Sequence, residues 1–167
     1  MNNLTLIDTF FINSKINKLT RDLIIIFLGS LLLTISAKFK IDIPPVPITL
    51  QTLVVLVFAL SAGRKLATLT FSFYLFQGFI GLPVFATAPF GGPVYFIGSS
   101  AGYLLGMLIA SYVVGYLAEK NYDKNYFKSL LILILGSLII FIPGILWLGF
   151  WFNILSPGAE SLDFYQS

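Results

Sequence analysis

Five long apolar segments, separated by short polar links, dominate the sequence. We expect membrane spans at about residues 23–37, 48–62, 66–80, 98–118 and 127–152, with the first lengthened to Phe39 and Ile41 while Lys38 and Lys40 snorkel. The chain is 57% hydrophobic and only 10% charged, whereas soluble domains carry about 25% charged residues. The sequence therefore predicts an all-α integral membrane protein, a bundle of five transmembrane helices in which Pro143 interrupts the last.

Most of the basic residues lie on one side of the predicted membrane spans. Eight of the ten lie before the first span, between the second and third, or between the fourth and fifth: Lys15, Lys18, Arg21, Arg64, Lys65, Lys120, Lys124 and Lys128. The positive-inside rule then places the N-terminus in the cytoplasm and the C-terminus outside the cell membrane. We divide the chain into a cytoplasmic arm (1–20), a transmembrane domain (21–155) and an irregular tail (156–167).

The residue types that the sequence lacks, and the positions of its charged residues, exclude several functions. The sequence has no Cys or His, and all seven Asp and Glu lie outside the predicted spans. No acid, base or metal set is therefore available at membrane depth, so we predict no catalytic or metal site, no cofactor, and no proton- or ion-coupled carrier. A net charge of +3 gives no basic face for nucleic acid. There is no phosphate-binding loop, so any ATP would be bound by another subunit.

The segment 81–97, between the third and fourth predicted spans, is rich in Gly and Pro and has no charge. Long ordered loops are usually functional. Neutral polar and aromatic side chains gather at the same predicted outer level, where they suit a small ligand with an apolar body. The alternative for Gln51 and Gln77 is hydrogen bonding between helices. The candidate binding residues are Thr49, Gln51, Tyr74, Gln77, Tyr95, Ser99, Ser100 and Tyr103.

Small residues follow one side of the first predicted span: Gly29, Ser30, Thr34 and Ala37. Small side chains let two membrane helices approach closely. We favour packing of this face inside the bundle. The alternative is docking to another membrane subunit.

Four short motifs resemble those of a known family. They are Pro-Pro-Val-Pro-Ile-Thr-Leu-Gln-Thr-Leu at 44–53, Gly-Leu-Pro-Val-Phe-Ala at 81–86, Gly-Gly-Pro at 91–93 and Gly-Tyr-Leu-Leu-Gly at 102–106. Together they are similar to the BioY family, the biotin-binding S components of energy-coupling factor (ECF) transporters. The similarity covers about residues 23–155.

The resemblance implies a six-helix membrane protein that captures biotin near the outer surface. It also implies docking to an energising module, made of a transmembrane T component and two ATP-binding subunits. In the family the small-residue face of the first helix meets the T component, and this would be the face of Gly29, Ser30, Thr34 and Ala37. The family's pocket falls on Gln51, on the turn 81–85 with Phe85, and on the stretch 98–103. Amide and hydroxyl side chains can pair with the ureido ring of biotin.

The sequence departs from the family in two places. Gly-Ser-Ser-Ala-Gly-Tyr at 98–103 stands where the family usually has Gly-Pro-Thr-Gly-Gly-Tyr. A sixth span, which in the family carries an Asp and a Lys near the ligand, cannot be assigned. Our first interpretation is a biotin-binding subunit for uptake across the cytoplasmic membrane, with the hypothesis that it is truncated and that its binding is weakened or lost. The alternatives are an S component for another small vitamin, a structural remnant without a ligand and, more distantly, a membrane enzyme.

Overall fold

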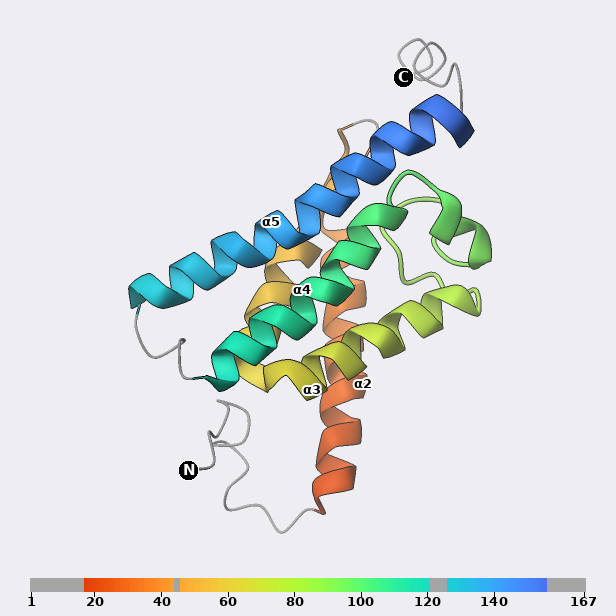
Figure 1. Cartoon of the computed structure of the whole chain (residues 1–167). Coiled ribbons are helices and arrows are strands. Elements are labelled where there is room, and N and C mark those ends of the chain that lie inside the picture. Colours follow the sequence, from red (N-terminus) through yellow and green to blue (C-terminus); the bar gives the residue numbers. More distant parts are fainter. Residues whose placement is uncertain (1–16, 44–45, 121–125, 156–167) are drawn as a thin grey trace.

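The structure, a computed structural model, describes residues 17–43, 46–120 and 126–155. This part of the chain contains four helices that are long and apolar enough to cross a membrane: α2 (Lys18–Lys38), α3 (Gln51–Phe79), α4 (Ala101–Glu119) and α5 (Tyr126–Phe150). Helix α5 continues into the π-helical turn η3 (Trp151–Leu155). Helix α3 packs against both α2 and α4, and α4 packs against α5 (Figure 1). The helices agree with the predicted all-α membrane fold.

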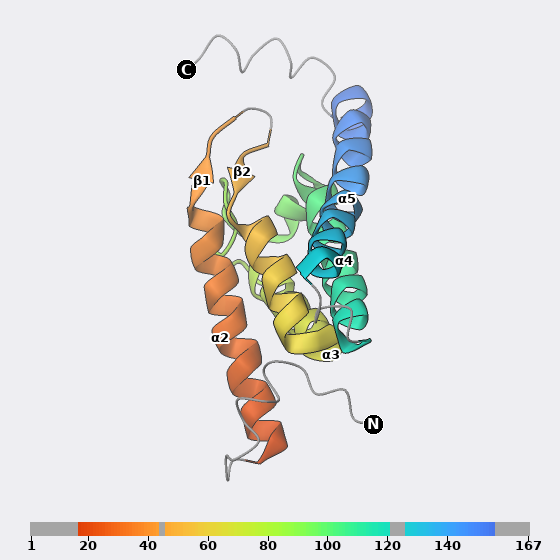
Figure 2. The ribbon, with the colours of Figure 1, turned by 90° about the vertical axis from the view of Figure 1, so that its left-hand side faces the viewer.

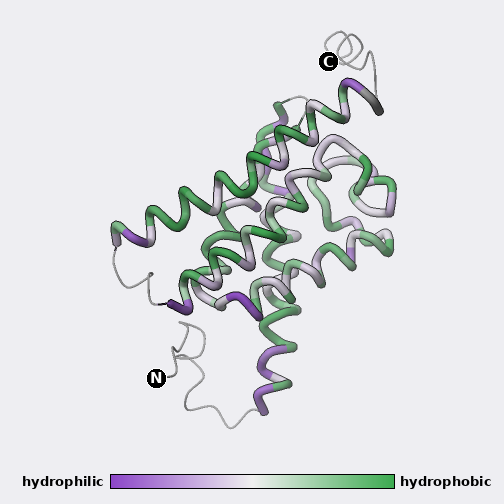
Figure 3. Tube along the Cα trace, viewed as in Figure 1, coloured by the Kyte–Doolittle hydropathy of each residue, from purple (hydrophilic) through white to green (hydrophobic). Residues whose placement is uncertain are grey.

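The surface of these helices is apolar along most of their length. Hydrophilic segments lie mainly at helix ends and at the bend of α3, whereas the middle of each helix is hydrophobic (Figure 3). Large apolar side chains such as Phe27 on α2 and Leu146 on α5 are 58% and 71% exposed. An exposed apolar face on every helix fits a lipid environment, because lipid tails can shield these side chains from water without burial inside the protein.

Helix α3 contains both the second and the third predicted spans. Its backbone leaves the helical region at Gly63, where φ is 75° and ψ is 171°. The side chains of Gln51 and Tyr74, near its two ends, lie close together, so the chain folds back at Gly63. At this bend Gly115 of α4 packs so closely that a Cβ there would lie 2.5 Å from the Arg64 nitrogen. Five separate spans are therefore not seen; two of the predicted spans are the two arms of α3.

Replacing Gly63 by Ala should strain this bend. Its φ and ψ lie in a region that is essentially restricted to glycine, where other residues cost about 1–3 kcal/mol. We expect Gly63→Ala to lower the free energy of unfolding by that amount, measured by titrating the protein in mixed micelles with sodium dodecyl sulfate. Gly149→Ala is the matched control, because a Cβ there meets no atom within 4 Å. Equal stability of the two variants would contradict the assigned bend.

The first predicted span is wrong at both ends. Helix α2 begins at Lys18, so residues 18–20 belong to a helix rather than to the arm, and it ends at Lys38 instead of reaching Ile41. The reason is a short antiparallel pairing of β1 (Lys40–Ile41) with β2 (Ile48–Thr49), which the view in Figure 2 shows beyond the end of α2. This pairing gives the backbone of β1 hydrogen-bond partners outside a helix.

The same pairing corrects the second predicted span. Thr49 lies in strand β2 and not in the first turn of a helix, which begins at Gln51. Helix α5 runs through Pro143 as one helix to Phe150, and the kink expected at Pro143 stays a prediction. The remainder of the predicted arm (1–16) and the predicted tail (156–167) lie outside the described residues.

Candidate functional site

The segment 80–100, which connects α3 to α4, packs the side chains of Phe85, Tyr95 and Phe96 inward. The ring of Phe85 is 1% exposed and stacks on that of Tyr95, with 4.2 Å between ring centroids. The rings of Tyr74 and Phe96 each pack edge-to-face with the ring of Phe85, with 5.6 Å between ring centroids. Gly78 of α3 has no side chain, and the Phe85 ring lies directly against it. The connection is therefore a packed part of the bundle, and Phe85 is at its centre.

Two hydrogen bonds hold this segment from different helices. The Tyr74 hydroxyl of α3 donates to the carbonyl of Val84 at 3.0 Å. The Lys38 amine at the end of α2 donates to the carbonyl of Phe85 at 2.6 Å and lies 4.8 Å from the centre of the Phe90 ring. The two bonds fix adjacent carbonyls, so the backbone at 84–85 cannot shift without breaking both.

Replacing Lys38 by Met should loosen this segment while keeping the length of the side chain. A hydrogen bond from a charged group contributes about 1.5–3 kcal/mol. We expect Lys38→Met to speed amide hydrogen exchange at Phe85, whose N–H donates to the Phe90 carbonyl at 2.9 Å, and at Phe90, whose N–H donates to the Thr87 carbonyl at 2.7 Å. Lys40→Met is the control, since the ion pair of Lys40 in the described part of the chain is with Asp42, whose side chain is 69% exposed, and such surface pairs contribute little. Unchanged exchange in Lys38→Met would show that the contact does not hold the segment.

A cavity of about 180 Å³ opens between this segment, strand β2 and the first turns of α3 and α4. Its lining is mostly apolar, with hydroxyl and amide groups at intervals, and none of the described residues that line it is charged. A small, apolar pocket with a few polar groups suits a small organic molecule. The lining residues are Val46, Pro47, Ile48, Thr49, Gln51, Thr52, Ala86, Tyr95, Ser100, Tyr103, Leu104, Met107 and Phe141.

The side chain of Gln51 is the most informative polar group in this pocket. Gln51 is only 4% exposed, and its Nε2 atom has no hydrogen-bond partner among the described residues. It lies close to the Tyr74 hydroxyl, which itself donates to the Val84 carbonyl. A buried donor without an acceptor costs about 1–3 kcal/mol. Gln51 thus places a buried amide in the wall of the pocket.

The structure brings five of the nine predicted binding residues together around this pocket: Thr49, Gln51, Tyr95, Ser100 and Tyr103. The other four do not line it. Tyr74 and Phe85 form the buried layer behind Tyr95. Gln77 lies near the end of α3, where its Oε1 is buried without a partner among the described residues, and Ser99 is half-buried just before α4.

Several lining residues are absent from the sequence-based prediction. Leu104 and Met107 follow Ser100 and Tyr103 on one face of α4, at the i, i+3, i+4, i+7 spacing of a helix, and this spacing could have revealed them. Phe141 comes from α5, where it meets the edge of the Tyr103 ring at 6.0 Å. No local pattern distinguishes Phe141 from the other apolar residues of α5, so only the packing of α5 on α4 identifies it.

The predicted docking residues on α2 face the inside of the chain. Gly29, Ser30 and Ala37 are buried, and a Cβ at Gly29 would lie 2.7 Å from Thr70 and 2.8 Å from Phe58, one on each arm of α3. Thr34 is half-buried, with its hydroxyl donating to the Ser30 carbonyl at 2.9 Å. The small residues thus let both arms of α3 approach α2, and a role in contact with another subunit stays a prediction.

Known proteins resemble this chain over most of its length. The pattern of the BioY family matches residues 5–165. The chain belongs to the BioY family. Among its relatives in the family, the biotin transporter BioY of Thermotoga maritima is 36% identical over 120 residues, which are 72% of this chain and 69% of that protein. The biotin transporter BioY2 of Lactococcus lactis is 32% identical over 153 residues, 91% of this chain and 80% of that protein.

Another BioY relative and one solved structure support the same assignment. The probable biotin transporter BioY of Rickettsia prowazekii is 35% identical over 127 residues, which span 76% of this chain but only 64% of that protein. The crystal structure of the S-component for biotin from an ECF-type ABC transporter superposes with a TM-score of 0.74 and 29% identity, covering 83% of this chain and 76% of that one. The BioY chain described here is thus a multi-pass membrane protein of a transporter family.

Proposed function

We propose that this chain captures biotin in the pocket between β2, α3 and α4, as the S component of an ECF-type transporter. The observation that carries the proposal is the unpaired, buried Nε2 donor of Gln51, in a chain whose relatives are named biotin transporters. A ligand with a strong acceptor at one end of an apolar body would pair with this donor. The ureido ring of biotin has such an acceptor, its carbonyl oxygen.

The other groups of the pocket suit the rest of the molecule. The hydroxyls of Thr49 and Ser100 can accept from the two ureido N–H groups. Leu104, Met107 and Phe141 provide apolar surface for the sulfur ring and the valerate chain. The proposed orientation therefore has the ureido ring toward Gln51 and the chain along the face of α4.

The carboxylate of biotin would stay at the opening of the pocket. None of the described lining residues is charged, and burying an unpaired carboxylate is very costly. We therefore expect the pocket to bind the neutral ring of the ligand, and we expect a charge at the far end of the ligand's chain to change the affinity little.

The arrangement in the membrane follows from the same proposal. The pocket lies at the end of the bundle where α3 and α4 begin, and Arg64, Lys65 and Lys120 lie at the other end. The positive-inside rule favours an outward-facing pocket, a cytoplasmic N-terminus, and five crossings in which each arm of α3 counts as one. We propose that an energising module, with a T component and two ATP-binding subunits, releases the captured biotin into the cell.

Two analogues of biotin test the proposed orientation by equilibrium competition against labelled biotin. Biotin amide removes the carboxylate charge and should bind within about threefold of biotin, a difference of less than 1 kcal/mol. In 2-iminobiotin an imino group replaces the carbonyl oxygen. Its protonated form has N–H donors and no acceptor at this position, so it cannot accept a hydrogen bond from Gln51. It should bind at least about tenfold more weakly, since one unmet donor costs 1–3 kcal/mol. The reverse order of affinities would place the carboxylate, and not the ureido ring, in the pocket.

A further inference from the structure

A second pocket, of about 440 Å³, lies at the opposite end of the bundle from the candidate biotin site. Glu119 and Lys120, where α4 ends, line it, whereas Ser100 and Tyr103, where α4 begins, line the first pocket. From Tyr103 to Lys120 the helix rises by roughly 25 Å. The two pockets share no lining residue, so the second is a separate site on the molecule.

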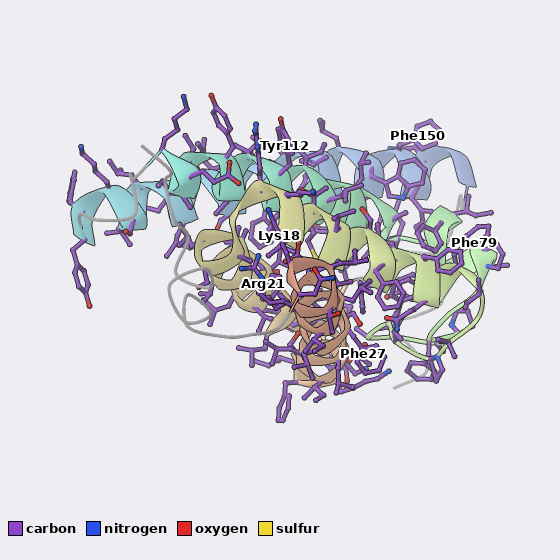
Figure 4. The ribbon with its side chains drawn as sticks, turned by 90° about the horizontal axis from the view of Figure 1, so that it is seen from below. Lys18, Arg21, Phe27, Phe79, Tyr112 and Phe150 are labelled. Atoms are coloured by element: carbon purple, nitrogen blue, oxygen red, sulfur yellow. The ribbon has the colours of Figure 1, made fainter. Side chains whose placement is uncertain are left out.

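The second pocket is lined by positive charge from three separate elements. Lys18 and Arg21 come from the first turn of α2, Arg64 and Lys65 from the bend of α3, and Lys120 from the end of α4. Figure 4 looks onto this end of the bundle, with Lys18 and Arg21 labelled beside the bend. These five cations face two carboxylates, so the described lining carries an excess of positive charge.

Both carboxylates already have arginine partners. Asp22 accepts from Arg21 Nη2 at 2.8 Å. Glu119 accepts from the backbone N–H of Arg64 at 2.9 Å and pairs with its guanidinium at 3.1 Å. Within the described ranges, Lys18, Lys65 and Lys120 have no carboxylate within ion-pair distance. The lysines are therefore the charges left for a ligand.

The aromatic ring of Tyr116 helps to fix two of these cations. The Arg64 guanidinium lies 5.4 Å and the Lys120 amine 5.5 Å from the centre of this ring. Two like charges over one ring repel each other, and an anion between them would relieve that repulsion. The cationic groups are thus held in place from both α3 and α4.

An apolar groove lies further along the α2–α3 interface. It has a volume of about 590 Å³ and is lined by Leu23, Ile26 and Phe27 of α2 and by four residues of α3 between Leu69 and Phe76. The groove is next to the basic pocket on both helices. On α2, Asp22 lines the pocket and the next residue, Leu23, lines the groove. On α3, Leu66 lines the pocket and Leu69, about one turn later, lines the groove. A basic pocket at a helix end next to an apolar groove is the arrangement that fits a charged headgroup with its acyl chain.

We propose that the pocket at the bend of α3 binds the phosphate of an anionic membrane lipid, with an acyl chain of that lipid along the α2–α3 groove. Basic pockets between membrane helices bind anionic headgroups, and each nearby Lys or Arg strengthens attraction to an anionic membrane. The proposal goes beyond biotin capture and does not depend on it. A lipid bound here would brace α2 against the bend of α3.

Native mass spectrometry of the full chain tests this proposal by counting lipids that stay bound. The probes are dioleoyl-phosphatidylglycerol and dioleoyl-phosphatidylcholine, which share acyl chains but differ in net charge. We expect the anionic lipid to bind more tightly. Lys65→Gln should weaken it about fivefold, and Lys65→Gln with Lys120→Gln about 25-fold, if each lysine contributes as basic residues do at anionic surfaces.

The control is Lys40→Gln, because Lys40 lies in β1 at the other end of the bundle; it should change the affinity less than about twofold. Lys65 and Lys120 are exposed, so the variants should unfold like the parent protein, and Lys65→Gln alone suffices if the double variant does not fold. Equal binding of both lipids, or an equal loss in the control, would overturn the proposal. Displacement of the lipid by millimolar inorganic phosphate would also overturn it, by assigning the pocket to free phosphate.

Discussion

Replacing Phe85 by Ala should lower the free energy of unfolding by about 3–5 kcal/mol, the usual cost of deleting a buried aromatic side chain. Phe85 is 1% exposed and contacts the rings of Tyr74, Tyr95 and Phe96. Its removal leaves a cavity between α3 and the connection to α4, which the surrounding rings cannot close without moving the Val84 and Phe85 carbonyls from their donors. Unfolding in mixed micelles with sodium dodecyl sulfate measures the loss.

The matched control is Phe39→Ala, since Phe39 is 64% exposed. This change should cost less than about 1 kcal/mol, as for most exposed positions. Phe85→Ala should also weaken biotin binding, because Tyr95 loses the ring on which it stacks. If both variants had the same stability, the aromatic layer would not be the support of the pocket that the structure indicates.

Replacing Gln51 by Leu should weaken biotin binding by about tenfold to a hundredfold, since a ureido oxygen without its donor loses 1–3 kcal/mol. Leu has a similar volume, so the pocket keeps its shape. The unpaired Nε2 means that the folded protein gains little from this side chain. The stability of Gln51→Leu should therefore stay within about 1 kcal/mol of the parent, which separates a binding effect from misfolding. Equilibrium titration with labelled biotin measures the change.

Gln77→Leu is the control for this experiment. Gln77 also has a buried polar atom without a partner in the described part of the chain, but it does not line the pocket. Its replacement should change the affinity for biotin less than about twofold, a difference of under 0.5 kcal/mol. If Gln77→Leu lost as much affinity as Gln51→Leu, the ligand would not occupy the pocket between β2 and α4.

The amino-acid pattern predicted the helices better than their ends. Long apolar runs determine where a chain can cross a bilayer, and the runs at 98–118 and 127–152 correspond closely to α4 and α5. The end of α2 was missed because the pairing of Lys40–Ile41 with Ile48–Thr49 is a tertiary contact with no strong local signal. The bend of α3 is visible in sequence as Gly63, but only its positive φ shows how sharply the chain turns.

The candidate site was predicted in part, for a physical reason. Gln51, Ser100 and Tyr103 are polar residues at predicted helix ends, which can be recognised in a sequence, and they line the pocket together with Thr49 of β2. Phe85 and Tyr74 do not line the pocket but form the buried aromatic layer behind Tyr95. Whether an aromatic residue faces a ligand or supports a residue that does depends on packing, and composition does not contain that information.

Direct binding of biotin is the measurement that tests the central proposal most directly. The purified 167-residue chain would be titrated in detergent with labelled biotin, with thiamine and riboflavin as competitors. We expect saturable binding at nanomolar to low micromolar biotin that the other vitamins do not reduce. A monodisperse, helical protein that shows no saturable binding up to about one millimolar, equivalent to less than roughly 4 kcal/mol of binding free energy, would contradict it.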